Sequence, residues 1–132
     1  MEALDLSFNM LSGLLLSCFD SMSVLSTFYM DNNLLTGALP SLNELEQLSE
    51  FNISSNGFSG SIGDSFCSST GIVFFDISNN EFSGPWPECL TDSVRLQDVL
   101  LNNNLFTGPV PASVGKLRSV IIFQLFENFF SG

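Results

Sequence analysis

Apolar and polar residues alternate over short stretches that recur along the whole chain. Each stretch carries two apolar residues two positions apart, and the six pairs are Leu4/Leu6, Phe28/Met30, Phe51/Ile53, Phe75/Ile77, Val99/Leu101 and Phe123/Leu125. Alternation with a period of two is typical of a β-strand that buries one face. The pattern therefore predicts six short strands, and we expect them to pair in one parallel sheet.

An asparagine closes each stretch at a nearly constant interval. The intervals are 24, 23, 24, 24 and 24 residues, for Asn9, Asn33, Asn56, Asn80, Asn104 and Asn128. A buried amide must satisfy both its donor and its acceptor groups. We therefore expect these structural asparagines to bond the backbone of adjoining turns as a ladder. The glycine four residues after each asparagine, such as Gly108, is expected to form a tight turn with positive φ.

The residues from Leu96 to Phe106 read L-x-x-L-x-L-x-x-N-x-L, the pattern of a leucine-rich repeat. Its copies predict one array over residues 1–132, with approximate repeats 1–24, 25–47, 48–71, 72–95, 96–119 and 120–132. Prolines at Pro40, Pro87 and Pro111 are expected to end strand pairing. The segments 41–47 and 112–118 carry apolar residues at every third position, which predicts short 3₁₀ or helical turns on the return path.

Two further phrases resemble a particular form of the repeat. The segment 106–111 reads F-T-G-P-V-P, like the L-x-G-x-(I/V)-P of plant-type repeats, and the segment 4–9 reads L-D-L-S-F-N, like their L-D-L-S-x-N. The third repeat departs from the form, because Gly63 stands where a proline is expected. The chain thus resembles the ectodomains of plant leucine-rich-repeat receptor kinases and receptor-like proteins.

This resemblance implies both a fold and a function. The fold is an α/β solenoid, a right-handed superhelix with a parallel β-sheet on its concave side and short 3₁₀ or helical turns on its convex side. The implied location is the extracellular side of the plasma membrane or the cell wall. In that family the inner surface binds peptides, small hormones or microbial patterns, often together with a co-receptor kinase.

Charge and composition exclude several other classes. Fourteen acidic residues against three basic ones give a net charge of −11, which argues against nucleic acid as a partner. Histidine is absent, so a Ser-His-Asp or Cys-His nucleophile is excluded and zinc would lack its usual nitrogen ligands. Asp76 and Asp98 could bridge calcium, but the loop spacing of a dedicated site is missing. We expect no enzyme activity, no cofactor and no metal site.

The two ends of the chain lack features that a complete receptor would carry. The sequence has no run of 18 apolar residues, so it predicts no membrane span. The N-terminal residues lack the pattern of a signal peptide. Neither end has the polar or cysteine-paired unit that caps a solenoid. We therefore expect the chain to be a piece of a longer protein or a truncated gene product.

The outward strand positions are the candidates for function. The residues that we expect to bind a ligand are Tyr29, Asp31, Glu50, Phe74, Asp76, Asp98, Leu100, Ile122, Gln124 and Phe126. No basic residue is among the outward positions, because Arg95, Lys116 and Arg118 all fall in return segments. An acidic face with an apolar patch suits a peptide or protein with basic and apolar groups. The alternative is a sheet face that is merely solvated.

Cysteines and one sequon complete the candidates. Cys67 and Cys89 are 22 residues apart in the return segments of adjacent repeats, so they are either a disulfide or two buried thiols. Cys18 is expected in the core. Asn52 begins the sequon N-I-S, which is either glycosylated or unused. A glycan there would push the ligand towards the fourth to sixth repeats.

The preferred function is a protein- or peptide-binding module of an extracellular receptor that senses a ligand. A secreted cell-wall inhibitor or structural protein of the polygalacturonase-inhibitor type is the alternative, because it shares the repeat without a kinase. A truncated product with no independent role is the third hypothesis.

Overall fold

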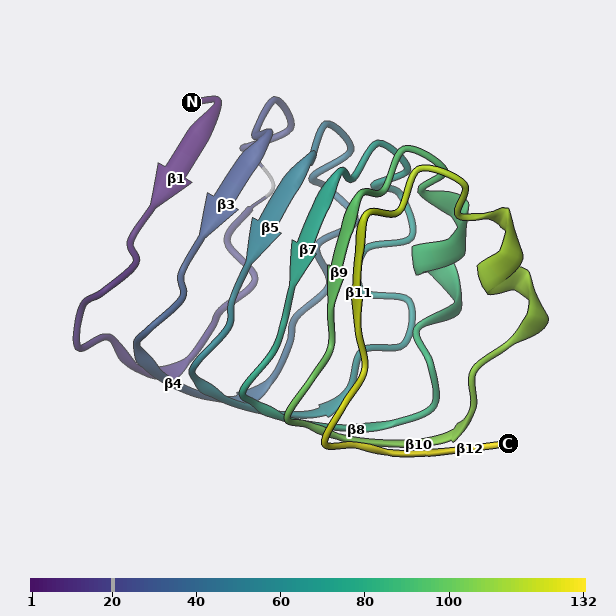
Figure 1. The fold of residues 1–132 in the computed structure, drawn as a ribbon. Helices are drawn as coiled ribbons and strands as arrows, with labels where there is room; N and C mark the ends of the chain where they lie inside the picture. Colours follow the sequence, from purple (N-terminus) through teal and green to yellow (C-terminus); the bar gives the residue numbers. More distant parts are fainter. Residues whose placement is uncertain (20) are drawn as a thin grey trace.

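The computed structural model describes residues 1–19 and 21–132 and is a solenoid of parallel strands (Figure 1). One six-stranded sheet has the order β1-β3-β5-β7-β9-β11. Its strands are β1 (Ala3–Asp5), β3 (Thr27–Tyr29), β5 (Glu50–Asn52), β7 (Phe74–Asp76), β9 (Asp98–Leu100) and β11 (Ile122–Gln124). We call it the front sheet. It confirms the solenoid and the parallel sheet that the sequence predicts.

Phenylalanine rings stack along the interior of the solenoid. Phe28, Phe51 and Phe75 are register partners in the front sheet, and their ring centroids lie 5.4 and 5.5 Å apart. A second column contains Phe58, Phe82, Phe106 and Phe130. Stacked rings at these distances add to the free energy gained by removing apolar surface from water. These stacked phenylalanines therefore fill the core.

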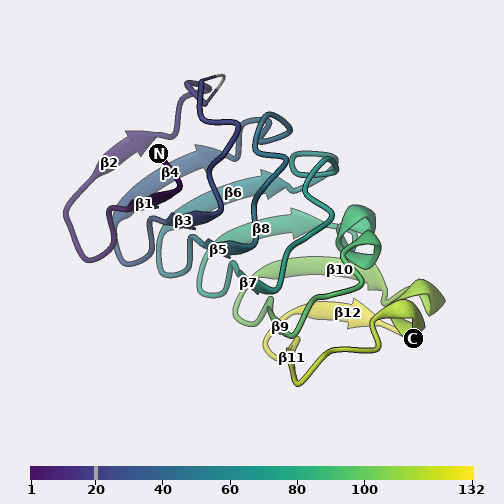
Figure 2. The ribbon, with the colours of Figure 1, turned by 90° about the horizontal axis from the view of Figure 1, so that it is seen from above.

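A second parallel sheet was not predicted (Figure 2). Its strands are β2 (Ser12–Leu14), β4 (Leu34–Ala38), β6 (Gly57–Ser61), β8 (Glu81–Gly84), β10 (Leu105–Pro109) and β12 (Phe129–Ser131). The positive φ expected at the glycines is present, for example 78° at Gly108. These glycines lie in or beside strands, however, so the prediction of tight turns is wrong. The front sheet holds successive repeats about 4.8 Å apart. The segments that follow are therefore also close enough to pair.

Within residues 1–19 and 21–132, helical structure is limited to two 3₁₀ helices on the return path. They are η1 (Glu88–Asp92) and η2 (Ala112–Lys116), and each begins after a proline, Pro87 or Pro111. The helix over 112–118 is thus confirmed, whereas segment 41–47 contains only turns. Its apolar residues Leu42 and Leu45 are nevertheless fully buried.

The asparagines form the ladder that joins successive repeats. Asn80 donates from Nδ2 to the carbonyl oxygen of Ile53 at 3.0 Å and accepts at Oδ1 from the backbone N–H of Phe58 at 3.0 Å. The same pair of bonds to the preceding repeat recurs at Asn33, Asn56, Asn104 and Asn128. Among the described residues, Asn9 bonds only carbonyls of its own repeat. Each buried amide is thereby paired at both ends, which avoids the cost of an unsatisfied polar group.

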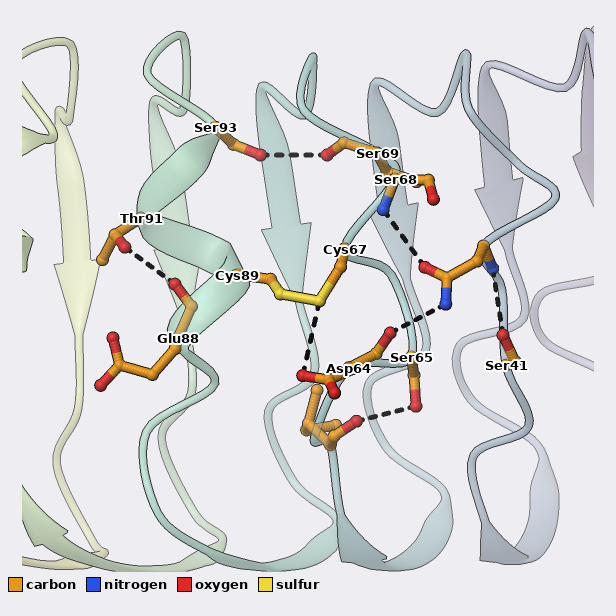
Figure 3. Close-up of a disulfide and its surroundings, with 12 residues drawn as sticks. Ser41, Asp64, Ser65, Cys67, Ser68, Ser69, Glu88, Cys89, Thr91 and Ser93 are labelled. Atoms are coloured by element: carbon orange, nitrogen blue, oxygen red, sulfur yellow. Dashed lines mark hydrogen bonds between the residues drawn. A yellow bond between two sulfur atoms is a disulfide. The ribbon is translucent and has the colours of Figure 1, made fainter.

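The return path has its own links between the second, third and fourth repeats (Figure 3). Cys67 and Cys89 form a disulfide with a Cα–Cα distance of 5.1 Å. Asn43 donates to the carbonyl of Asp64 at 3.0 Å, and Ser93 Oγ donates to the carbonyl of Ser69 at 3.1 Å. These contacts hold the return path at the spacing that the two sheets set.

Cys18 was expected in the core, but the structure places it at the surface. The neighbouring Phe19 takes the buried position instead, with 3% of its surface exposed. An aromatic ring removes far more apolar surface from water than a thiol does, which accounts for the exchange.

Candidate ligand-binding face

The outward side chains of the front sheet lie in three rows, which together we call the front face. The first row is Ala3, Thr27, Glu50, Phe74, Asp98 and Ile122, and the second is Asp5, Tyr29, Asn52, Asp76, Leu100 and Gln124. The third row lies two residues further on: Ser7, Asp31, Ser54, Ser78, Asn102 and Phe126. From Asp31 onwards, each third-row carbonyl accepts a backbone N–H from the preceding repeat, so this row is aligned as well.

Asx turns fix the second and third rows in three repeats. Asp76 Oδ1 accepts the backbone N–H of Ser78 at 3.0 Å and its hydroxyl at 2.6 Å. Asn52 with Ser54, and Asp5 with Ser7, make the same two bonds. A short polar side chain that bonds the backbone two residues ahead stabilises the turn locally. These second-row carboxylate and amide oxygens are thus already engaged within the chain.

Burial and hydrogen bonding act in opposite directions on the carboxylates of these turns. Burial raises the pKa of Asp76, and the two bonds from Ser78 only partly offset it. At the exposed Asp5, the bonds from Ser7 dominate and lower the pKa. The same Asx turn therefore leaves a weaker acid in the middle of the sheet than at its first strand.

Two polar groups of the second repeat converge on Glu50 of the third repeat. Tyr29 donates its hydroxyl to Glu50 Oε2 at 2.9 Å, and the Thr27 hydroxyl lies 3.4 Å from the same oxygen. Burial, followed by the contact with Glu50, raises the pKa of Tyr29 to about 12. Asp31 is only 7% exposed and accepts a hydrogen bond from Asn32 at 2.8 Å. Asp31 therefore presents little surface on this face, and its contact with a ligand stays a prediction.

The last two repeats have no Asx turn on this face. Leu100 and Gln124 occupy the second row where the first, third and fourth repeats have Asp or Asn, and Asn102 and Phe126 occupy the third row where those repeats have serine. Phe126 is 54% exposed and Ile122 is 41% exposed. The front face is thus polar and internally bonded over the first four repeats, and more apolar beyond them.

Known proteins share the repeats and the fold of this chain. Residues 1–22 and 47–69 match the family model described as Leucine Rich Repeat. Over 96% of its length the chain superposes on the ectodomain of the Arabidopsis thaliana membrane receptor kinase GASSHO1/SCHENGEN3, with a TM-score of 0.91 and 28% identity. The chain is an array of leucine-rich repeats.

Other plant receptor ectodomains are similar to the array. That of the Arabidopsis receptor kinase HAESA matches 96% of it with a TM-score of 0.89 and 31% identity, and that of SOBIR1 from Arabidopsis thaliana matches 93% with a TM-score of 0.80 and 27% identity. The array spans 15% of the GASSHO1 chain, 21% of the HAESA chain and 66% of the SOBIR1 chain. No curated protein sequence matches it.

The predicted ligand residues divide into two groups in the array. Tyr29, Glu50 and Asp76 are half-buried and bonded to neighbouring side chains. The other predicted ligand residues, apart from Asp31, lie on or next to the last three strands of the front sheet: Phe74, Asp98, Leu100, Ile122, Gln124 and Phe126. Phe74 and Leu100 are half-buried, so the apolar surface there is centred on Ile122 and Phe126.

Asn102 lies at an outward position of this face but is not among the ligand residues predicted above. It is 6% exposed, and its Oδ1 has no hydrogen-bond partner among the described residues. The signal was available in the sequence, because L-L-N at 100–102 replaces the D-I-S at 76–78.

Asn52 lies in the middle of the front face. Its Oδ1 accepts the two bonds from Ser54 described above, and the residue is half-buried on β5. Its glycosylation stays a prediction, and so does the displacement of a ligand towards the later strands that a glycan there would cause.

Asp64, Cys67 and Cys89 group their ligand atoms within 4.8 Å of one another on the return path (Figure 3). Metals bind cysteine as thiolate, and the disulfide removes both thiolates. The cluster therefore acts as a structural link, in which Cys67 Sγ lies 3.6 Å from Asp64 Oδ1.

A shallow hollow of about 590 Å³ lies at the other end of the array, ahead of β1, β3 and β5. It is lined by Glu2, Ser23, Val24, Ser26, Glu46 and Gln47. The hollow is open and is separate from the apolar part of the front face. Over residues 1–19 and 21–132, no helix is long and apolar enough to span a membrane.

Proposed function

We propose that the array is a peptide-binding module and that its ligand lies across β7, β9 and β11. The observation that carries the proposal is the combination of apolar side chains and carboxylates on this part of the front face. Ile122 is exposed beside its register partner Asp98, Phe126 is exposed just beyond β11, and Asp76 lies on β7. No basic residue stands in the three rows. Exposed apolar patches on a sheet mark contact surfaces, and carboxylates attract cations. The ligand is therefore an extended peptide with apolar and basic side chains.

The similar proteins support this proposal. The GASSHO1/SCHENGEN3 ectodomain is in complex with CASPARIAN STRIP INTEGRITY FACTOR 2, and the HAESA ectodomain is in complex with an IDA peptide hormone ligand. HAESA with IDA also has the co-receptor SERK1 in a further structure. By extension we propose an extracellular location for the array and a role beside a co-receptor kinase. We propose binding rather than catalysis, because an open sheet gives its carboxylates no enclosed pocket.

A synthetic heptapeptide tests the proposed face. In the acetylated and amidated sequence Lys-Ser-Leu-Ser-Lys-Ser-Leu, all lysines and leucines lie on one side of an extended chain. Titrated into the ¹⁵N-labelled 132-residue chain, it should give saturable shift changes confined to residues 74–78, 98–102 and 122–126. The same peptide with glutamate in place of lysine should not bind, because it would be repelled by the carboxylates.

Matched variants separate the apolar contact from general stickiness. Phe126→Ala should weaken peptide binding by about tenfold, as expected for an aromatic contact residue. Phe129→Ala is the control, because Phe129 is 66% exposed but belongs to β12 in the second sheet. Equal losses from both variants, or shift changes spread over the second sheet, would refute the proposed face.

A further inference from the structure

Asn102 is a buried polar side chain without a partner on the front face. Only 6% of its surface is exposed, and its Oδ1 is buried without a hydrogen-bond donor in the described part of the chain. An unsatisfied buried amide destabilises a fold, so native proteins retain few of them. A position that keeps such a group points to a role outside the folding of its own repeat.

The neighbouring repeats show why Asn102 lacks a partner. At the same positions in the third and fourth repeats, Ser54 donates to Asn52 at 2.7 Å and Ser78 donates to Asp76 at 2.6 Å. The second-row neighbour of Asn102 is Leu100, which has no acceptor. The backbone of Asn102 is nevertheless in the regular ladder, since its carbonyl accepts the N–H of Asn79 at 3.0 Å. The change is therefore confined to the side chains.

The residues around Asn102 indicate which ligand groups could hydrogen-bond to it. In the rows of the front face, Asn102 stands between Ser78 and Phe126, and Leu100 and Asp98 precede it in β9. Apolar surface on two sides reduces competition from water, so a hydrogen bond made there by a ligand gains strength. An apolar ligand side chain would lie over Leu100 and Phe126, and a cationic one would face Asp98.

We propose that Asn102 binds the main chain of the peptide ligand. A peptide group offers one N–H and one C=O, which complement the oxygen and the NH₂ of a side-chain amide. Asn102 thereby sets the register of an extended ligand, whereas Asp98 and Phe126 select its side chains. This inference rests on the proposed function, because it assumes that a peptide lies across β9.

Methylation of single backbone nitrogens tests the proposal. Four versions of the Lys-Ser-Leu-Ser-Lys-Ser-Leu peptide carry one N-methyl group each, at the second to fifth residues, and their dissociation constants are measured by NMR titration. Against the wild-type chain, one version should bind about fivefold more weakly than its parent, the loss of one neutral hydrogen bond. Against Asn102→Leu, the same version and the parent should bind within a factor of two of each other. Asn103→Ser is the control variant and should keep the wild-type difference.

The outcomes separate this inference from the proposed function. If the parent peptide binds the front face and loses affinity with Phe126→Ala, but no methylated version depends on Asn102, then Asn102 does not bind the main chain and the proposed function stands. If the parent peptide does not bind the wild-type chain at all, both proposals fall. Intact amide dispersion in the ¹H–¹⁵N spectrum of each variant shows that a lost effect is not caused by unfolding.

Discussion

The fourth and fifth repeats share one scaffold but differ in the side chains they expose on the front sheet. Both have a buried structural asparagine, Asn80 or Asn104, with the same bonds to the preceding repeat. In the fourth repeat Asp76 and Ser78 satisfy each other, whereas in the fifth Leu100 and Asn102 do not. The comparison shows that stacking depends on the inward positions and leaves the outward positions free to vary. The repeat that gives up its internal bonds is therefore the better candidate for contact with another molecule.

The largest expected effect is the loss of stability when a structural asparagine is removed, which tests whether the fourth and fifth repeats are held equally strongly. Asn80→Ala and Asn104→Ala should each lower the free energy of unfolding by about 3 kcal/mol, because each leaves a buried N–H and a buried carbonyl without partners. Thermal or urea unfolding measures the loss. Asn9→Ala should cost less than 1 kcal/mol by the same criterion, since Asn9 is exposed and bonds only its own repeat. A loss at Asn104 much smaller than at Asn80 would mean that the fifth repeat is not held in the same way.

The next effect concerns the Asx turn itself. Ser78→Ala should destabilise the chain by about 1–2 kcal/mol, because the half-buried Asp76 carboxylate loses a charge-assisted bond. Ser7→Ala removes the equivalent bond from the exposed Asp5 and should cost less. Equal losses from the two variants, measured by urea unfolding, would contradict the account of burial at Asp76.

Asn102→Leu should stabilise the chain, in contrast to the substitutions above. It removes an unpaired buried amide next to Leu100, so stability should rise by about 1 kcal/mol. The measurement is the urea midpoint at constant m-value, because an altered m-value would signal a changed native or denatured state. A loss of stability would mean that Asn102 has a structural partner and would remove the main reason for assigning it to a ligand.

The smallest expected effect is the pH dependence of stability that Tyr29 contributes in the polar half of the front face. Tyr29 is the only tyrosine in the chain, so its ionisation can be followed by ultraviolet absorbance. Its pKa is raised to about 12, which favours the protonated form in the folded state. The stability it contributes is therefore complete below pH 10, the ordinary tyrosine value, and is lost as the pH rises from 10 to about 12. Glu50→Gln should move the midpoint down towards 10, and an unchanged midpoint would leave burial as the whole cause.

The front sheet and its asparagine ladder were predictable from the sequence because period-two alternation and a fixed interval both mark inward positions. The second sheet was not predicted, because glycines such as Gly37 and Gly108 interrupt any alternation there and are uncommon in strands. Its pairing follows from the spacing that the front sheet imposes on neighbouring repeats. That is a tertiary effect which no single segment encodes.

The candidate site was likewise predictable in part from the sequence. The sequence identified the outward rows, but it could not show that Asp31 is buried or that Tyr29 is bonded to Glu50, because both depend on contacts between adjacent repeats. The sequence placed Asn102 among the outward positions of its repeat, beside Asp98 and Leu100. Its importance appears when Ser54 and Ser78 are seen to have partners that it lacks.

The most direct measurement converts the fifth repeat into a copy of the fourth. Leu100→Asp together with Asn102→Ser should install the Asx turn of Asp76 and Ser78 on β9, leaving the inward residues unchanged. The account predicts that this double variant keeps the wild-type fold and unfolding midpoint within about 1 kcal/mol. It should bind the Lys-Ser-Leu-Ser-Lys-Ser-Leu peptide at least tenfold more weakly, in spite of its additional carboxylate. A double variant that stays folded and binds the peptide as tightly as the wild-type chain would contradict the claim that the unpaired, apolar repeat is the ligand site.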